Sequence, residues 1–424
     1  MNYKNLKTSQ LEKELTELKI KYETFKSENL KLDMSRGKPC PEQLDLSMGI
    51  LDCLTSEDIC KAQNGTDCRN YGGLEGIPEM RAIFAQILEV TPDEVIIGGN
   101  SSLNMMYDTV ARAMQFGVPG GEGPWGKLPK VKFLCPSPGY DRHFAICESF
   151  GIEMIAVDMK QDGPDMDLVE KLVGEDESIK GIWCVPKYSN PDGITYSDEV
   201  VDRLATMPTK AKDFRIFWDN AYVVHHLNEK GDNLKNIFEV CKASSNIDRV
   251  ILFASSSKIS FPGAGVAAMA ASTTNISQTI KLMAVQTIGN DKLNQLRHVK
   301  YFKNIDGINE HMKKQASIIS PKFDVVLEIL EKELESKDIA WWNKPKGGYF
   351  ISLNTLDGCA KKIVAMAKEA GVTLTGAGAT YPYGKDPRDR NIRIAPTYPS
   401  IEELREAIEI LAVCTQIVSI EKVM

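Results

Sequence analysis

The sequence lacks the features that mark secreted, membrane-spanning and zinc-binding proteins. None of its ten cysteines belongs to a C-x-x-C pair, and the polar first residues, MNYKNLKTSQ, do not form a secretory signal. No apolar run approaches the roughly 18 residues that a membrane-spanning helix needs. The five histidines show no H-E-x-x-H spacing, so they indicate packing or surface positions and no metal site. We therefore expect a cytoplasmic protein with reduced, mostly buried thiols.

Basic residues do not outnumber acidic residues in this sequence. Lysine and arginine number 51 against 58 aspartates and glutamates, which gives a net charge of −7 at pH 7. Neither nucleic acid nor an anionic membrane is expected as a partner, and any anion must be held by a local site. At 424 residues, of which 43% are hydrophobic, the chain can build two or three lobes with a substantial core.

Strand and helix signals alternate through the middle of the chain. Helices are expected over residues 102–116 and 141–150, between strand-like segments that read EVIIGG, VKFLCPS, IEMIAVDM, IKGIWCVP, FRIFWDN and RVILFASSS. Such alternation predicts an α/β fold in which mostly parallel strands are joined by crossover helices. After Gly265 the sequence predicts a largely helical stretch.

The two ends of the chain carry a different pattern. An apolar stripe near the N-terminus predicts one amphipathic helix that lies on its own domain or on a second copy of the chain: Leu11, Leu15, Leu18, Tyr22 and Phe25. From about residue 315 we expect a second, smaller α/β lobe, with helices over 321–336, over 359–370 and from Ser400. The expected division is a helix and connector over 1–50 joining the small lobe, a large lobe over 51–314 and the small lobe over 315–424.

One strand-like segment ends in an unusual way. In ILFASSSKISFPGAG (251–265) three serines, one lysine and a Pro-Gly turn follow the apolar residues. Ligand sites in open α/β sheets lie just past strand ends. A lysine in a partly apolar crevice has a lowered pKa, which frees its amine for Schiff-base chemistry. This stretch alone leaves open an ordinary surface loop with a solvated lysine.

Three other strand ends carry polar residues that could serve a site. GGNSS (98–102) lies between a strand and a helix, where free N–H groups can bind a phosphate. It matches neither G-x-G-x-x-G nor a P-loop, which weakens dinucleotide and nucleoside-triphosphate binding. Asp219 ends a strand in FRIFWDNAY, where the alternative role is helix capping. Asn190 begins NPDG, which could be a simple turn.

Taken in order, these motifs resemble the pyridoxal-phosphate-dependent aminotransferases of the aspartate aminotransferase superfamily (fold type I). The resemblance runs from SRGKP near residue 35 to NIRIAP near 391. The phrases YGGLEGIPEMR, SNPDG, DNAY, SSSKISFPGAG and NIRIAPTYPS are most similar to a bacterial subgroup of aspartate aminotransferases. The implied fold has a large cofactor domain with a mostly parallel sheet and a smaller α/β domain built from the two chain ends.

The resemblance implies roles for residues around the cofactor ring. Lys258 would form the Schiff base with pyridoxal 5′-phosphate, and Asp219 would keep the pyridine nitrogen protonated so that the ring can accept electrons. Tyr222 and Asn190 would hydrogen-bond the ring hydroxyl oxygen. Tyr140 would lie on the face of the ring; a core or surface tyrosine is the alternative.

It also implies how the phosphate and the substrate are held. The phosphate would receive donors from two loops: Asn100, Ser101, Ser102, Ser255 and Ser257. Tyr71 would reach the phosphate of the neighbouring subunit, so the active unit would be a homodimer with shared active sites. Arg393 would bind the substrate α-carboxylate through a bidentate fork, with Gly37 and Asn190 in the same subsite. A surface arginine on an edge strand is the alternative.

Two features depart from the pattern or are left open by it. Gly265 occupies the position at which many relatives carry an arginine that faces the phosphate, so we expect another basic residue near the phosphate. No clamp for a second substrate carboxylate is evident. Arg36, Arg142 and Arg297 are the candidates.

The expected activity is transfer of an amino group from L-aspartate or L-glutamate to a 2-oxo acid, by a ping-pong cycle between pyridoxal and pyridoxamine phosphate. Alternatives are a transaminase for 2-aminoadipate, aromatic amino acids or alanine, and lyase chemistry on the same cofactor. A cofactor-binding transcription regulator would need a DNA-binding domain, whereas only about 35 residues precede the recognisable region. A NAD-dependent dehydrogenase is disfavoured by the missing glycine fingerprint.

Overall fold

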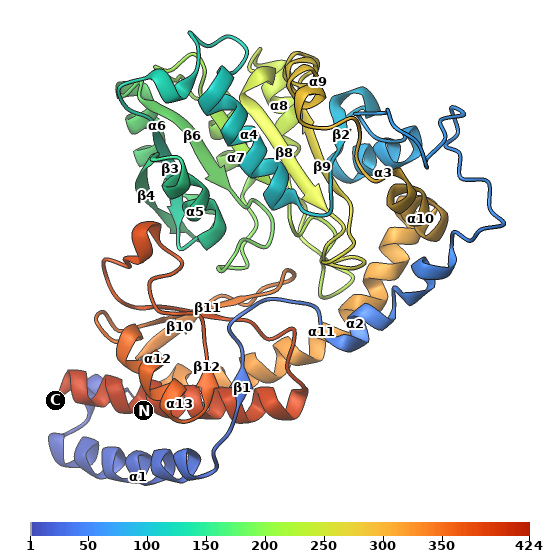
Figure 1. Cartoon of the computed structure of the whole chain (residues 1–424). Coiled ribbons are helices and arrows are strands. Elements are labelled where there is room, and N and C mark those ends of the chain that lie inside the picture. The colour runs from blue at the N-terminus through green and yellow to red at the C-terminus, as the bar shows by residue number, and fades with distance from the viewer. Residues whose placement is uncertain (1) are drawn as a thin grey trace.

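The computed structural model describes residues 2–424 and shows two lobes (Figure 1). The large lobe is built on a sheet with the strand order β2-β9-β8-β7-β6-β3-β4-β5. These strands are β2 (Val95–Ile97), β3 (Lys132–Ser137), β4 (Glu153–Lys160), β5 (Gly163–Pro164), β6 (Ile179–Cys184), β7 (Arg215–Asp219), β8 (Val250–Ser255) and β9 (Ala267–Ala271). β4, β3, β6, β7 and β8 pair in parallel, while β9 is antiparallel to β2 and β8, and β5 to β4. The predicted mostly parallel α/β lobe is confirmed.

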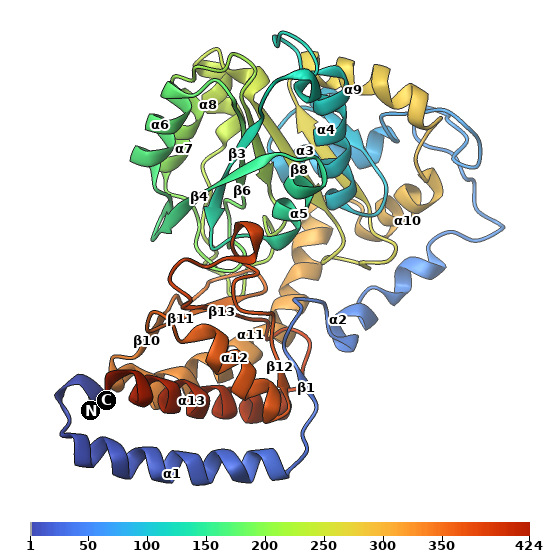
Figure 2. The same cartoon turned by 60° about the vertical axis from the view of Figure 1, so that its left-hand side comes forward.

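Helices cover both faces of this sheet (Figures 1 and 2). They are α3 (Pro78–Leu88), α4 (Ser102–Phe116), α5 (Asp141–Ser149), α6 (Met166–Glu175), α7 (Asp198–Thr206), α8 (Ile237–Ala243), α9 (Thr273–Gln286) and α10 (Lys292–Phe302). Alternate residues of β7 point to opposite faces, so Phe217 packs in one apolar cluster and Trp218 in another. A strand buried on both faces accounts for the continuous apolar run that the sequence shows there.

The small lobe combines the two ends of the chain. Its antiparallel sheet has the order β10 (Ala340–Trp342), β11 (Ile351–Thr355), β13 (Asn391–Ile394). The N-terminal strand β1 (Leu32–Asp33) pairs in parallel with β12 (Val372–Thr373), which brings the connector into this lobe. Helix α1 (Thr8–Ser27) lies along α13 (Ile401–Val423), with α12 (Ala360–Glu369) beside it (Figure 2). The amphipathic N-terminal helix therefore lies on its own chain.

The prediction of a helix that starts at Pro321 is wrong. Helix α11 spans Ile305–Leu334 and passes through Pro321. A proline inside a helix removes one backbone hydrogen bond and costs about 3 kcal/mol or more. Pro321 lies on the exposed face of α11, while a buried stripe that includes Ile319 and Phe323 packs on both sides of it. This packing outweighs the local cost. The predicted boundary between the large and small lobes, at 314/315, falls inside α11. The division of the chain into segments 1–50, 51–314 and 315–424 stays a prediction.

The expectation of a mainly helical stretch after Gly265 is also wrong at its start. Residues 267–271 form strand β9 before helices α9, α10 and α11 begin. The segment reads AAMAA, and alanine has high helix and low strand propensity. The strand forms because it is buried between β2 and β8, where small side chains fit and the neighbouring strands supply its hydrogen bonds.

The remaining short elements are α2 (Pro41–Asp45) and the 3₁₀ turns η1 (Tyr3–Asn5), η2 (Met48–Asp52), η3 (Pro92–Glu94), η4 (Trp125–Lys127), η5 (Ile247–Arg249), η6 (Glu335–Lys337) and η7 (Pro382–Gly384). All ten cysteines are free thiols, and all but Cys53 and Cys60 are buried, as expected. Within residues 2–424, every helix is too short or too polar to cross a lipid bilayer.

Candidate active site

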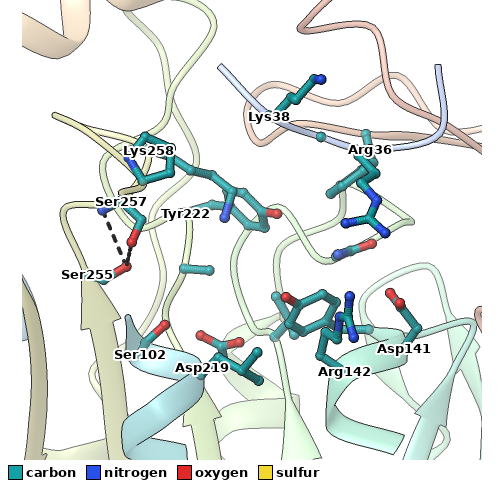
Figure 3. Close-up of a pocket in the computed structure, with 18 of the residues that line it drawn as sticks. Arg36, Lys38, Ser102, Asp141, Arg142, Asp219, Tyr222, Ser255, Ser257 and Lys258 are labelled. Atoms are coloured by element: carbon teal, nitrogen blue, oxygen red, sulfur yellow. Dashed lines mark hydrogen bonds between the residues drawn. The ribbon is translucent and has the colours of Figure 1, made fainter. Parts of the chain in front are cut away.

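A cavity of about 540 Å³ opens between the two lobes, past the carboxyl ends of the central strands (Figure 3). The large lobe contributes the ends of β7 and β8 and the first turns of α4 and α5. The small lobe contributes Phe350, Thr375 and Arg393, and the connector after β1 contributes residues 35–38. Both the position and the volume are typical of a small-molecule site in an open α/β sheet.

Most of the residues predicted for the site line this one cavity. They are Gly37, Ser101, Ser102, Tyr140, Asn190, Asp219, Tyr222, Ser255, Ser257, Lys258 and Arg393. Asn100 lies just outside it, where its main-chain oxygen accepts a hydrogen bond from Ser257 Oγ at 3.0 Å. Tyr71 is away from the cavity on a protruding loop and is 80% exposed. The structure thus brings together all the predicted residues except Asn100 and Tyr71. The roles assigned to all these residues stay predictions.

Lys258 lies in the loop after β8 and is partly exposed to the cavity. Its Nζ lies 5.1 Å from the centroid of the Tyr222 ring and 5.9 Å from that of Tyr349. The removal of water by these neighbours lowers the pKa of Lys258, and the charge of Asp219 opposes the shift only in part. The solvated surface loop that the sequence left open is therefore not what forms, and the amine is poised to act as a nucleophile.

Asp219 ends β7 with one carboxylate oxygen satisfied and the other free. Its Oδ2 accepts a hydrogen bond from Nε2 of His143 at 3.0 Å, and both side chains are buried. Its Oδ1 is buried without a hydrogen-bond partner in residues 2–424. A buried carboxylate oxygen without a donor is costly, so this oxygen indicates a ligand that brings an N–H or O–H group. The side chain does not cap a helix, which removes the alternative role considered above.

The sequence analysis missed His143, which it treated as a packing or surface residue. His143 lies in the first turn of α5, stacked on Trp183 with ring centroids 4.3 Å apart. Tyr140 meets the same imidazole edge-on at 5.0 Å. These contacts hold the ring so that Nε2 faces Asp219. The only signal in the sequence is the position of His143 three residues after Tyr140, and that spacing does not reveal a partner 76 residues away.

Serine hydroxyls and the start of α4 form an anion cradle on one side of the cavity (Figure 3). Ser101 caps α4 by accepting a hydrogen bond from the backbone N–H of Leu103 at 3.2 Å. Ser255 Oγ donates to Ser257 Oγ at 3.1 Å, which ties the two serines together. Free N–H groups, the positive end of the helix dipole and hydroxyls together suit a phosphate.

The structure gives a physical reason for the glycine at position 265. A Cβ on Gly265 would lie 3.1 to 3.2 Å from three backbone atoms, among them the oxygen of Asn100 and the nitrogen of Ser257. A larger residue would therefore push apart the two loops that carry the cradle. Arg297 lies beyond these loops, in a separate hollow of about 180 Å³ that borders Asn100 and Gly265. It does not line the central cavity, and a basic residue close to the phosphate stays a prediction.

Arg393 joins the two lobes at the opposite side of the cavity. Its Nη1 donates to Asp141 Oδ1 at 3.0 Å and to Asn190 Oδ1 at 3.3 Å, both in the large lobe. Its Nη2 donates to Thr375 Oγ1 at 3.2 Å, and its guanidinium carbon lies 4.9 Å from the centroid of the Phe350 ring. β13 is an edge strand, but Arg393 is only 7% exposed, which excludes a surface arginine. Asp141, Thr375 and Phe350 were not identified from the sequence.

The turn that carries Asn190 also contains a buried carboxyl group. Gly193 N donates to Ser189 O at 2.7 Å and closes the turn, with a φ of 68° at Gly193 that favours glycine. Asp192 inside this turn is buried, and burial raises the pKa of its carboxyl group to about 6. The folded state therefore holds a proton on Asp192 at pH values where the unfolded chain has lost it.

We expect Asp192→Asn to stabilise the protein, with a larger gain at pH 8 than at pH 5. The contribution of Asp192 to the free energy of unfolding falls as the pH rises from about 4 to about 6. In this range the unfolded chain has lost the proton of Asp192, so folding requires its uptake. Above about pH 6 the loss of stability is complete and no longer changes with pH. A shift of about two pKa units corresponds to about 3 kcal/mol at most. Thermal unfolding of both proteins at pH 5, 6.5 and 8 measures the difference. A gain that is equal at all three pH values would show that the carboxyl group does not titrate in this range.

Comparison with known proteins agrees with this geometry. A family model described as aspartate amino-transferase matches residues 6–424. The chain is 45% identical over 405 residues to an aspartate aminotransferase of Corynebacterium glutamicum, covering 96% of this chain and 93% of that protein. The crystal structure of an aspartate transaminase from Corynebacterium glutamicum superimposes with a TM-score of 0.97 at 43% identity, covering 100% of both chains. An alpha-aminoadipate aminotransferase of Thermus thermophilus, solved with N-(5′-phosphopyridoxyl)-L-leucine, shares the fold with a TM-score of 0.75 at 20% identity, covering 92% of both chains.

Proposed function

Because this chain belongs to the aspartate aminotransferase family, we propose that it transfers the amino group of L-aspartate or L-glutamate to a 2-oxo acid with pyridoxal 5′-phosphate as its cofactor. The chain is an aminotransferase, and enzymes of this kind act on amino acids and 2-oxo acids. Aminotransferases of this fold depend on pyridoxal phosphate. The observation that carries the proposal is one cavity that holds Lys258, the free carboxylate oxygen of Asp219 and the serine cradle together.

The residues of the cavity fit this cofactor. The free Oδ1 of Asp219 would accept a hydrogen bond from the protonated pyridine nitrogen, which removes the cost of an unpaired buried oxygen. The serine cradle at the start of α4 would hold the phosphate. Tyr222 and Asn190 would hydrogen-bond the ring oxygen, and Tyr140 would cover the ring. Bound there, the cofactor supplies an aldehyde that bonds to amines and a ring that accepts electrons.

The side chains of this protein would transfer the proton, position the cofactor ring and bind the substrate. Lys258 Nζ, whose pKa is lowered by burial, would accept the proton from the substrate Cα. Asp219, held in place by His143, would face the ring nitrogen. Arg393 would bind and orient the α-carboxylate of the substrate in the same cavity as Lys258. His143 acts through Asp219 and is therefore a positioning residue.

A substrate panel tests the proposed activity. Purified protein loaded with pyridoxal phosphate is mixed separately with aspartate, glutamate, 2-aminoadipate, alanine and phenylalanine, and the spectral change of each half-reaction is followed. We expect kcat/KM to be highest for aspartate or glutamate, because a second carboxylate adds charge-assisted contacts in a cationic cavity. Faster reaction of alanine or phenylalanine would assign another specificity, and no reaction with any amino acid would contradict the proposal.

We further propose that the protein is a homodimer whose active sites are shared. Tyr71 is 80% exposed, and no residue within 2–424 hydrogen-bonds its hydroxyl group. The segment between η2 and α3, which contains Tyr71, projects from the large lobe (Figures 1 and 2). Gly72 N donates to Ile288 O at 3.2 Å, which joins this loop to the segment after α9. Apolar side chains at this junction are strongly exposed, with Val285 at 90% and Ile288 at 61%. An exposed apolar surface of this kind is typical of a protein–protein contact.

Mixed dimers test whether Tyr71 acts across the interface. We expect Tyr71→Ala and Lys258→Ala proteins to be poorly active or inactive when each is made alone. Coexpression under two different tags, followed by purification on both, should recover activity, because each mixed dimer contains one intact site. Doubly purified mixed dimers should show about half of the wild-type activity per dimer, because one of their two sites is intact. Failure to recover activity in doubly tagged dimers would show that Tyr71 serves its own subunit, and full activity of Tyr71→Ala alone would show that Tyr71 serves no site.

The cytoplasmic location predicted from the sequence also remains a proposal. It is supported by the ten free thiols. Cell fractionation with an antibody against the protein would test it, and recovery from an oxidising compartment would contradict it.

A further inference from the structure

Two of the arginines that line the active-site cavity have no partner. Five cationic side chains reach this cavity, and three of them are accounted for by contacts or by the proposed chemistry: Arg393, Lys258 and Lys38. Lys38 Nζ lies 3.8 Å from the centroid of the Tyr398 ring, and Figure 3 shows its amine turned away from the cavity. Arg36 and Arg142 make no ion pair and no side-chain hydrogen bond with any residue in 2–424.

The position of Arg142 is unfavourable for a purely structural residue. It is the second residue of α5 (Asp141–Ser149), at the end of the helix where the dipole is positive. A cation there is disfavoured by about 0.3–1 kcal/mol at an exposed site. Arg36 faces the same side of the cavity from the connector of the other lobe (Figure 3). Both side chains are exposed, so water screens part of their repulsion, and an anion between the two guanidinium groups would be favoured.

Both arginines are placed next to the proposed α-carboxylate subsite by hydrogen-bonded neighbours. Asp141, which precedes Arg142, accepts from Arg393 at 3.0 Å. Ser35, which precedes Arg36, accepts at its main-chain oxygen from Thr375 Oγ1 at 2.5 Å, and Thr375 accepts from Arg393 at 3.2 Å. Arg142 therefore follows a residue that is hydrogen-bonded directly to Arg393. Arg36 follows a residue that is linked to Arg393 through Thr375. The Cα and one or two methylene groups separate the carboxylates of aspartate and glutamate, so a second carboxylate would remain close to the first.

We propose that Arg36 and Arg142 of the same chain together bind the second carboxylate of a dicarboxylic substrate, while Arg393 binds the first. The inference rests on the proposed aminotransferase function and names the groups that select its substrate. The charges of the lining residues agree with this proposal. Arg36, Arg142 and Arg393 together with Asp141 have a net charge of +2, which matches the two carboxylates of the substrate. Guanidinium groups form paired hydrogen bonds with carboxylates, which lysine does not reproduce. Arg297, the third candidate from the sequence, lies outside the cavity and is removed from this role.

The test compares dicarboxylic with monocarboxylic substrates in the holoenzymes of Arg142→Gln, Arg36→Gln and the double variant. We expect each single change to lower kcat/KM for aspartate and glutamate by about 10- to 100-fold, the range for loss of a charged hydrogen bond. The values for alanine and phenylalanine should stay within about threefold of wild type, because these substrates have no second carboxylate. Succinate, which does not react, should bind more weakly to each variant when titrated by calorimetry, while acetate should be unaffected.

The matched control is Arg405→Gln, which removes an exposed arginine from α13 far from the cavity and should leave both substrate classes unchanged. Arg142→Lys should recover only part of the aspartate activity, since the charge remains and the fork is lost. If wild type prefers aspartate and both glutamine variants keep that preference, the clamp proposal is wrong and another group binds the second carboxylate. An equal loss for all substrates would also overturn it, by showing a structural role. If wild type shows no preference for dicarboxylates, the proposed specificity itself fails.

Discussion

Replacement of Lys258 by alanine is expected to lower kcat for transamination by about 10⁴-fold or more. The amine of Lys258 would hold the cofactor and move the proton at the substrate Cα, and general acid–base groups alone contribute up to about 10⁴-fold. No other lysine Nζ lies over the ring of Tyr222 or Tyr349. Steady-state kinetics with aspartate and a 2-oxo acid measures the loss. Borohydride reduction of the holoprotein followed by peptide mapping should label Lys258 in wild type.

Lys187 provides the matched control for this experiment. It is also buried and its pKa is also lowered by burial, but its Nζ donates to Val223 O at 3.0 Å and does not reach the cavity. We expect Lys187→Met to keep kcat within a few-fold of wild type, although its stability can change. Labelling of a different lysine by borohydride, or turnover in Lys258→Ala close to that of wild type, would show that the proposed chemistry is wrong.

The second large effect is expected from Asp219→Asn, with a loss of about 10²- to 10⁴-fold in kcat. The change removes the negative charge that would stabilise a protonated ring nitrogen, and it leaves His143 without its charged partner. Groups that stabilise a proton or a developing charge at the reacting centre contribute about 10²- to 10⁴-fold to the rate. The measurements are kcat for aspartate and the pH dependence of the cofactor spectrum, which a purely structural role would not shift.

Asp213 is a suitable control, because it is a second buried carboxylate near the other end of the same strand. It pairs with Lys180 at 2.6 Å and accepts from Trp125 Nε1 at 2.8 Å, outside the active-site cavity. Asp213→Asn should lower the melting temperature while kcat of the folded protein stays near wild type. Equal losses of kcat in the two variants would indicate that Asp219 matters only for folding.

Much of the fold could be predicted because the signals are local. The apolar runs that end at Asp219 and Ser255, the helix that begins at Ser102 and the capping residue Ser400 all follow from neighbouring residues. Two elements were missed for the opposite reason. The alanines of β9 favour a helix locally, and Pro321 indicates a helix start, but burial between strands and along α11 reverses both preferences.

The candidate site, too, could be predicted from the sequence only in part. Residues at the ends of neighbouring parallel strands could be expected to meet, because those ends share one edge of the sheet, and Asp219 does pair in register with Phe253, two residues before Ser255. The partners of these residues could not be expected. His143, Asp141 and Thr375 carry no motif that indicates their contacts.

The sequence by itself determined a large α/β lobe with a lysine, a carboxylate and small hydroxyl residues at its strand ends, since periodicity and strand endings are properties of adjacent residues. Only the tertiary structure decided which groups act in pairs. His143 meets Asp219 across 76 residues, and Asp141 meets Arg393 across 252 residues and two lobes. Such contacts depend on how the helices and the small lobe pack against the sheet, and this packing is a sum over many buried side chains that no short motif encodes.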